Sequence, residues 1–259
     1  MTNPRVAADP RGGTNLRVAA DLIDAPGTDE DVWRRWPALG LLPRAGIENW
    51  ASAVVIAAHP DDEVLGVGGT MALLAAAGAR LRLVAVTDGE RSHPAAADPA
   101  GRAALAARRV AETAAALRML GAQRTEVIRL RHPDTGLAGC EDALTAELRE
   151  LTAGFDVCLA PWTGDAHADH EAAGRAARRA RAATFGYPVW MWHWARPDDP
   201  RVPWDRALRV PLPPQAAAAK QAAIHCFASQ LEDREPSGQP VLAPDDLAHF
   251  ARTQEVLLP

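Results

Sequence analysis

The sequence predicts an α/β fold: a single domain in which helices cover both faces of a mostly parallel sheet. Short, nearly continuous apolar runs recur through the middle of the chain, as in strands that are buried on both faces. Longer segments with helical patterns separate these runs, which is the alternation typical of parallel sheets. The chain has 259 residues, of which 48% are hydrophobic, so it is long enough to bury a large core.

The elements are expected in a regular order. The apolar runs predict strands over residues 52–58, 80–87, 126–131, 156–160 and 187–192. The helical patterns predict helices over 65–77, 102–120, 141–152 and 170–183, followed by an edge strand over 206–212 and a helix over 214–230. Gly78 and Gly121 come directly after two of these helical patterns, where glycine commonly ends a helix.

Residues 1–50 are expected to form an N-terminal arm in front of the domain of residues 51–259. Residues 1–27 are rich in Gly, Pro and Asp, which favours a loosely ordered segment. Residues 28–31 (TDED) resemble a capping box at the start of a short helix. Trp33 and Trp36 of that helix are expected to pack the arm onto the domain.

Composition limits the classes of partner. The net charge is −5 without a basic patch, so nucleic acid is not expected as a partner. No stretch approaches the roughly 18 apolar residues that a membrane span requires, and residues 1–30 lack the apolar core of a signal peptide, so we expect a cytoplasmic protein. The scattered Cys140, Cys158 and Cys226 indicate neither a disulfide framework nor a cysteine-based zinc site. The oligomeric state is left open.

Two polar clusters follow two of the predicted strands. The first contains His59, Asp61, Asp62 and Glu63, and the second contains His167, Asp169 and His170. Ligands bind outside the carboxyl ends of the strands in open α/β sheets. The two clusters therefore predict one metal site that is assembled from two loops.

Each residue type suits a task at such a site. His59, Asp62 and His170 form a set of two histidines and one carboxylate that suits Zn²⁺ and also tolerates Fe²⁺. Asp61 would then stay free of the metal and take a proton from the activated water as general base. His167 is expected to act as the acid or oxyanion partner, with Asp169 orienting it or stabilising its charge.

Simpler interpretations exist for each cluster alone. The acidic turn can be a solvated loop that favours the start of the next helix. His167 and His170 can be first-turn residues of a helix, and Glu63 is expected to cap the helix or fix the loop. The combination of both clusters at strand ends favours the metal site.

The motifs resemble those of a known family. Residues 58–63 (AHPDDE), 66–70 (GVGGT) and 167–170 (HADH) are similar to motifs of the LmbE-like, PIG-L-type de-N-acetylases, which include the N-acetylglucosaminyl-phosphatidylinositol, mycothiol and bacillithiol pathway deacetylases. The similarity spans roughly residues 54 to 258. It takes in residues 87–90 (TDGE), 109–112 (RVAE), Leu120, Gly121, Pro133 and Asp134.

The resemblance implies a Rossmann-like fold and a zinc-dependent hydrolase that removes an N-acetyl or other N-acyl group from an amino sugar or glycoconjugate by metal-activated water. It assigns the same roles to the two clusters. Asp134 matches a family position that contacts sugar hydroxyls, although a turn-forming Asp after Pro is an equal interpretation. Arg109 could reach the substrate, but an exposed helical arginine is the simpler interpretation.

Residues 1–50 and 190–194 (WMWHW) depart from the family pattern. The aromatic side chains of the second segment could stack on a sugar or an acyl group, but burial in an amphipathic strand is simpler.

Two other functions remain as hypotheses. A nucleotide-sugar glycosyltransferase that uses a divalent metal would explain the acidic loop, but it leaves His167 and His170 without a role and lacks a nearby basic contact for phosphate. A nucleotide-binding module would use Gly66, Gly68 and Gly69, but these glycines do not have the required spacing. They are expected instead to permit close packing of a helix beneath the metal loop.

Overall fold

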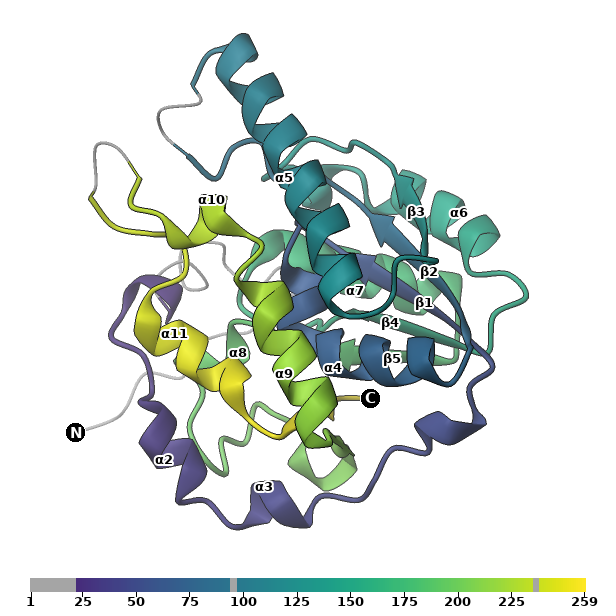
Figure 1. Ribbon diagram of the computed structural model, residues 1–259, viewed down its shortest axis with the longest axis vertical. Helices are drawn as coiled ribbons and strands as arrows, with labels where there is room; N and C mark the ends of the chain where they lie inside the picture. The colour runs from purple at the N-terminus through teal and green to yellow at the C-terminus, as the bar shows by residue number, and fades with distance from the viewer. Residues whose placement is uncertain (1–21, 94–96, 235–237) are drawn as a thin grey trace, which may run out of the picture.

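The computed structural model describes residues 22–93, 97–234 and 238–259. Its centre is a five-stranded sheet in the order β3-β2-β1-β4-β5, in which all neighbouring strands pair in parallel (Figure 1). The predicted α/β fold with a mostly parallel sheet is therefore confirmed. The strands are β1 (Ser52–Ala57), β2 (Arg80–Ala85), β3 (Glu126–Arg129), β4 (Val157–Pro161) and β5 (Thr184–Tyr187).

Helices cover both faces of this sheet. Alternate residues of β1 point to opposite sides: Val55 joins a core with side chains of α4, α5 and α9, while Ile56 joins a second core with side chains of α6 and α7. Full burial on both faces explains why residues 53–57 of β1 are all apolar. The helices are α4 (Asp62–Ala76), α5 (Pro99–Met119), α6 (Glu141–Leu151), α7 (Ala168–Ala180) and α9 (Pro214–Ile224).

The C-terminal third differs from the prediction. The segment expected as an edge strand forms β6 (Leu208–Pro211), which pairs antiparallel with β7 (Gln254–Leu257) in a separate two-stranded sheet. The single helix expected over 214–230 is divided into α9 and α10 (Ala228–Leu231). The amide of Ser229, in the first turn of α10, donates to the carboxylate of Glu112 on α5 and so satisfies a free amide at the start of this second helix.

The aromatic segment after β5 is a helix, α8 (Met191–Trp194), and the strand predicted over 187–192 is wrong. The fifth strand lies earlier, over Thr184–Tyr187. The carboxylate of Asp165 accepts the amides of Val189, Trp190 and Met191 at 2.8–3.0 Å. These bonds satisfy the free amides at the start of the helix, which a sequence pattern for strands does not reveal.

The described part of the N-terminal region lies along the domain. Trp33 of α2 (Glu30–Arg34) is fully buried, and its Nε1 donates to the carbonyl of Trp192. The residue that caps α2 is Asp29 rather than Thr28, whose hydroxyl donates to the carbonyl of Ala195. Residues 1–21 of the expected arm lie outside the described residues.

The remaining elements are short. They are α3 (Ala38–Leu41), α11 (Pro244–Ala248) and the 3-10 turns η1 (Ile47–Asn49), η3 (Leu137–Gly139), η4 (Trp204–Arg206) and η5 (His249–Ala251). Among the described residues, no helix is long and apolar enough to cross a membrane.

Candidate metal centre

The loop between β1 and α4 has a tightly held backbone. Asp61 has φ 117°, a conformation that residues other than glycine rarely adopt, so the surroundings must stabilise it. Its amide donates to Glu63 at 3.2 Å. Arg109 of α5 donates to the carbonyl of Pro60, and to that of Gly89 at 3.0 Å. The prediction of an exposed Arg109 is therefore wrong: its side chain is 3% exposed and its hydrogen bonds hold this loop in place.

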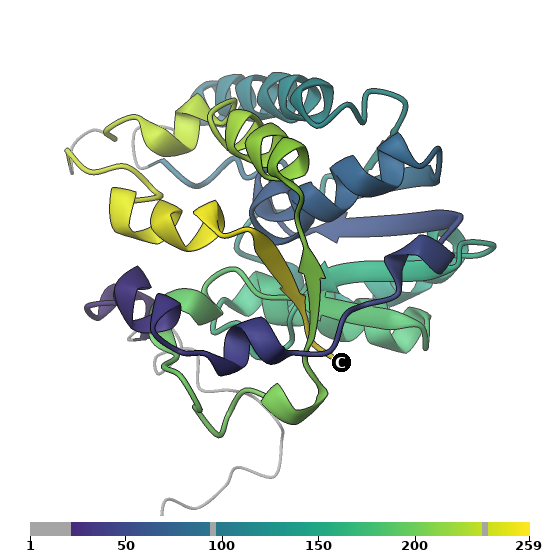
Figure 2. The same cartoon turned by 60° about the horizontal axis from the view of Figure 1, so that its bottom comes forward.

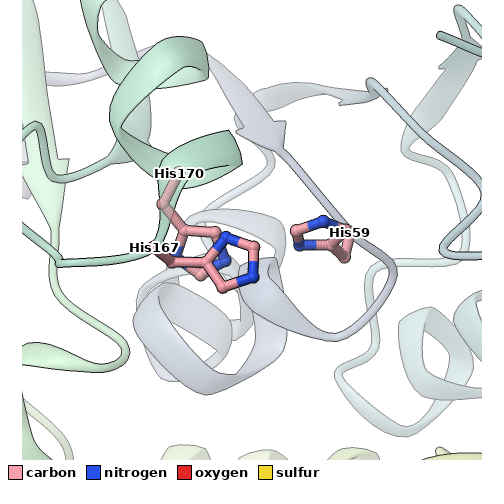
Figure 3. Close-up of side chains that lie close together, drawn as sticks. All are labelled: His59, His167 and His170. Atoms are coloured by element: carbon pink, nitrogen blue, oxygen red, sulfur yellow. The ribbon is translucent and has the colours of Figure 1, made fainter. Parts of the chain in front are cut away.

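The structure brings His59, Asp62 and His170 together from the two loops. The Oδ1 of Asp62 lies 3.2 Å from Nε2 of His170, and its Oδ2 lies 3.6 Å from Nδ1 of His59. Oδ2 also accepts the amide of His59 at 2.8 Å. The two imidazole centroids are 5.4 Å apart, and Figure 3 shows His59 from the segment after β1 facing His167 and His170 at the start of α7. A single ion between these side chains is thus within reach of both loops.

The second nitrogen of each histidine meets another carboxylate. His170 Nδ1 lies 2.7 Å from Asp165, and His59 Nε2 lies 3.3 Å from both Asp134 and Asp169. Such partners commonly fix the orientation of metal-binding histidines. Asp165 was missed by the sequence reasoning. Its only signal was its position five residues before His170, in the loop that precedes α7.

The predicted interaction of His167 with Asp169 is present only in part. His167 precedes α7, and its ring centroid lies 4.5 Å from that of His170 and 4.9 Å from that of His59. Asp169 does not orient it, because the carboxylate accepts the amides of Thr135 and Leu137 at 2.7 and 3.0 Å. Burial lowers the pKa of His167, and the charge of Asp169 partly opposes this effect, in agreement with the predicted charge stabilisation. Among the described residues, Nδ1 of His167 has no hydrogen-bond partner.

The electrostatics of the cluster favour added positive charge. Burial alone would lower the pKa of His170, but Asp62 and Asp165 raise it to about 9. The pKa of His59 is also raised well above its usual value despite burial, by Asp134, Asp169 and Asp62. The carboxylates therefore stabilise a cation at this point. The donor set of imidazoles and carboxylates fits a divalent zinc or iron ion.

Neighbouring acids differ in their pKa. Burial raises the pKa of Asp61 to about 7, opposed by Arg109, whose Nη2 lies 3.5 Å from the carboxylate. Burial would also raise the pKa of Asp62, but His170 and His59 hold it well below the usual range. Such a divergence separates an acid that stays anionic from one that can exchange a proton near neutral pH.

Two sets of donor atoms, neither of them the predicted triad of His59, Asp62 and His170, lie close enough to share one ion. His59, His167 and His170 form one, and His59, Asp134 and Asp169 form the other; in each set the ligand atoms lie within 4.8 Å of one another. His59 belongs to both sets and also contacts Asp62. The arrangement therefore places the candidate centre at His59 but offers more donors than one ion needs.

A cavity of about 190 Å³ opens over the cluster. Asp61, Asp62 and His167 contribute polar groups to its lining, and Trp190 and Leu242 contribute apolar surface. Asp134 also lines it, 4% exposed, and its carboxylate accepts the amide of Arg91 at 2.7 Å. The cavity thus joins the candidate metal centre to a space where a small molecule can bind.

The fold and this cluster define an α/β protein with a candidate metal centre at the carboxyl edge of its parallel sheet. Residues 54–181 match the sequence model of the family described as PIG-L: GlcNAc-PI de-N-acetylase. The chain belongs to this LmbE-like, PIG-L-type family.

One curated relative is a 1D-myo-inositol 2-acetamido-2-deoxy-alpha-D-glucopyranoside deacetylase from Streptomyces griseus, which is 37% identical over 151 residues. The match covers 49% of this chain and 47% of that relative, so the chain spans about half the length of the curated protein it matches.

Two solved structures share the fold. One is the N,N'-diacetylchitobiose deacetylase from Pyrococcus horikoshii, with 21% identity, a TM-score of 0.57 and coverage of 81% of this chain and 82% of that one. The other is a deacetylase of the A40926 pseudoaglycone, with 21% identity, a TM-score of 0.58 and coverage of 80% and 96%. At this identity the likeness concerns the fold alone.

Proposed function

We propose that this protein is a metal-dependent N-deacetylase that hydrolyses the N-acetyl or another N-acyl group of an amino sugar or glycoconjugate. The observation that carries the proposal is the contact of Asp62 with both His59 and His170 on the floor of a cavity. The deacetylases among the relatives support the reaction class. Their descriptions favour hydrolysis over the alternative of nucleotide-sugar transfer.

His59, Asp62 and His170 would hold the ion, with zinc as the first candidate and iron(II) as the second. When bound, such an ion polarises the amide carbonyl and lowers the pKa of water. In the overall reaction a water molecule adds to the acyl carbon, the carbon–nitrogen bond breaks, and a carboxylate and a free amine leave.

The protein's own groups would move the protons. Asp61, whose pKa lies at about 7, takes a proton from water as general base. Burial and the charges of His170 and His59 hold the pKa of His167 well below its usual value. His167 is therefore neutral near pH 7, so in this scheme it would donate its N–H to the oxyanion, or pass on to the leaving amine a proton that it takes up during the reaction. Asp169 supports His59 in this scheme, and Asp134 is available to substrate hydroxyls at the cavity wall.

The test combines metal analysis with amine release from a panel of N-acetylglucosaminides. We expect one tightly bound divalent ion per chain, and activity that a chelator removes and the ion restores. Asp61→Asn should keep the ion yet lose turnover by roughly 10²-fold or more, because the base does not ligate. His167→Ala should also keep the ion and slow turnover by a similar factor, whereas His170→Ala should lose the ion.

Two results would contradict the proposal. Loss of metal from the Asp61 variant would make that residue a ligand rather than a base. An active enzyme that is insensitive to metal removal, or activity only with a sugar nucleotide, would reject the metal-dependent hydrolase itself.

A further inference from the structure

A buried carboxylate of the last strand meets a bend in α4. Val67 has φ −138° and ψ 20°, which are not helical, so the helix is interrupted there. Just after the bend, the amides of Gly69 and Thr70 donate to the carboxylate of Glu255 on β7, both at 2.8 Å. In an uninterrupted helix these amides would bond to carbonyls four residues earlier. Glu255 therefore stabilises the bent form of α4.

The carboxylate has a matched set of donors. The hydroxyl of Thr70 donates to it at 2.6 Å, and Nζ of Lys220 on α9 lies 2.8 Å away. Lys220 is the only lysine of the chain, and it and Glu255 are each 3% exposed. A buried carboxylate requires such pairing, because desolvation without a partner is costly. The two residues thus join α4, α9 and β7, which lie side by side in Figure 2.

The bend lies one helical turn from the candidate metal centre. The segment between them begins at Asp62, whose carboxylate contacts both His59 and His170. Gly66 ends the segment against the ring of Tyr187, where an added Cβ would lie 2.1 Å from Cδ2. The direction of the first turn of α4 is therefore determined by the loop that contains Asp61 at one end and by the bend at Val67 at the other.

We infer that Glu255, neutralised by Lys220, is a positioning residue for the metal centre: by holding α4 bent at Val67 it directs Asp62 at the two histidines. The competing state is a straight α4, in which the amides of Gly69 and Thr70 return to helical bonds and the first turn points elsewhere. The inference deepens the proposed function and rests on its metal centre.

The test uses Glu255→Gln in the full chain. A glutamine offers one oxygen to four donor groups and turns its own NH₂ group toward the others, so the bend loses its support. We expect zinc affinity, measured by chelator competition on folded protein, to fall at least tenfold. Amide hydrogen exchange at Gly69 and Thr70 should accelerate in the metal-free protein. Glu255→Asp, which keeps the charge, should recover part of both properties.

Glu30→Gln is the matched control. Glu30 is also a buried carboxylate with charged partners, His249 and Arg252, but none of its hydrogen bonds or ion pairs reaches α4. This variant should lose stability and keep wild-type zinc affinity within about twofold, so a general loss of stability is separated from a loss of positioning.

Wild-type zinc affinity in folded Glu255→Gln would overturn the inference, as would unchanged exchange at the two amides. If the wild type binds no divalent ion, the proposed function fails independently. In that case the metal-free crystal structure of the variant decides the positioning role: a retained contact between Asp62 and His170 rejects it, and a lost contact supports it.

Discussion

At the scale of the residue, the sequence motifs predicted the candidate metal ligands but not the residues that hold those ligands in place. His59 and Asp62 stand three positions apart in one motif, and His170 lies in another, so residue types alone indicated a shared site. Arg109 and Asp165 gave no comparable signal. Arg109 has the spacing of an ordinary helical residue, and its importance comes from backbone carbonyls of loops 20 and 49 residues away. Such contacts depend on tertiary structure.

Replacement of Arg109 tests the proposal that Asp61 is the general base. Arg109 lowers the pKa of Asp61 against the effect of burial. In Arg109→Met that opposition is lost, so the pKa of Asp61 rises and the base is protonated over a wider range. The acidic limb of kcat/KM should therefore move to higher pH, with reduced activity at pH 7. A pH–rate profile measures both effects.

Arg108→Met supplies the control on the same helix. Arg108 contacts Glu112 and Glu232 rather than the loop, and 44% of its side chain is exposed. Its profile should match that of the wild type. An unshifted acidic limb in Arg109→Met would remove the charge of Arg109 from the mechanism.

At the scale of the element, the main strands and helices followed from apolar patterns, whereas the boundaries near the site did not. The helix predicted from residue 65 begins at Asp62, because the acidic Asp62 and Glu63 open its first turn and carry no apolar pattern. The aromatic segment 190–194 was misread as a strand, since the amides that start α8 are bonded by Asp165 from another loop. The glycines at 66–69 were expected to allow close packing. Gly66 against Tyr187 and Gly69 against Leu212 agree with this.

Gly66→Ala tests that packing. The new methyl group would lie 2.1 Å from the Tyr187 ring, whose hydroxyl donates to the carbonyl of Ile56 on β1 at 2.6 Å. Neither group can move without disturbing the buried core, so we expect a loss of roughly 3 kcal/mol in the free energy of unfolding. Chemical denaturation measures it.

Gly40→Ala is the paired control, because Gly40 lies in α3 with no atom within 4 Å of a new Cβ. That variant should be as stable as the wild type or slightly more so. Equal stability of the two variants would show that α4 can shift away from Tyr187, against the close packing described above.

Glu30 joins helix α2 to His249 and Arg252 near the C-terminus, and the pH dependence of stability tests this contact. Burial would raise the pKa of Glu30, but hydrogen bonds and charges of His249 and Arg252 lower it from 4.5 to about 2. A lowered pKa in the folded state adds stability above the unfolded value of 4.5, and this stability is lost as the pH falls toward 2.

Glu30→Gln lacks this contribution. The difference in unfolding free energy between wild type and variant should therefore be largest above pH 4.5 and shrink as the pH falls to 2. Urea unfolding across this range measures the difference. A difference that stays constant with pH would contradict the assigned pKa.

At the scale of the whole molecule, the parallel sheet explains why loops distant in sequence meet. β1 and β4 are neighbours in the sheet, so the loops after Ala57 and Pro161 leave the same edge. The alternation of strands and helices in the sequence predicted that these two loops lie at one edge of the sheet. The position of β7 could not be predicted in this way, because Glu255 contacts Thr70 of α4 across 185 residues of sequence. Local patterns therefore indicated which polar residues gather at the sheet edge, whereas the contact of Glu255 with α4 depends on the tertiary structure.

The central claim is that one divalent ion is held by His59, Asp62 and His170. Anomalous diffraction at the zinc edge, from crystals of the zinc-loaded protein, tests it most directly. We expect a single peak about 2.0–2.2 Å from one atom of each of these side chains, with a coordination position left open. No peak at this site, or a peak held instead by His59, Asp134 and Asp169, would contradict the account.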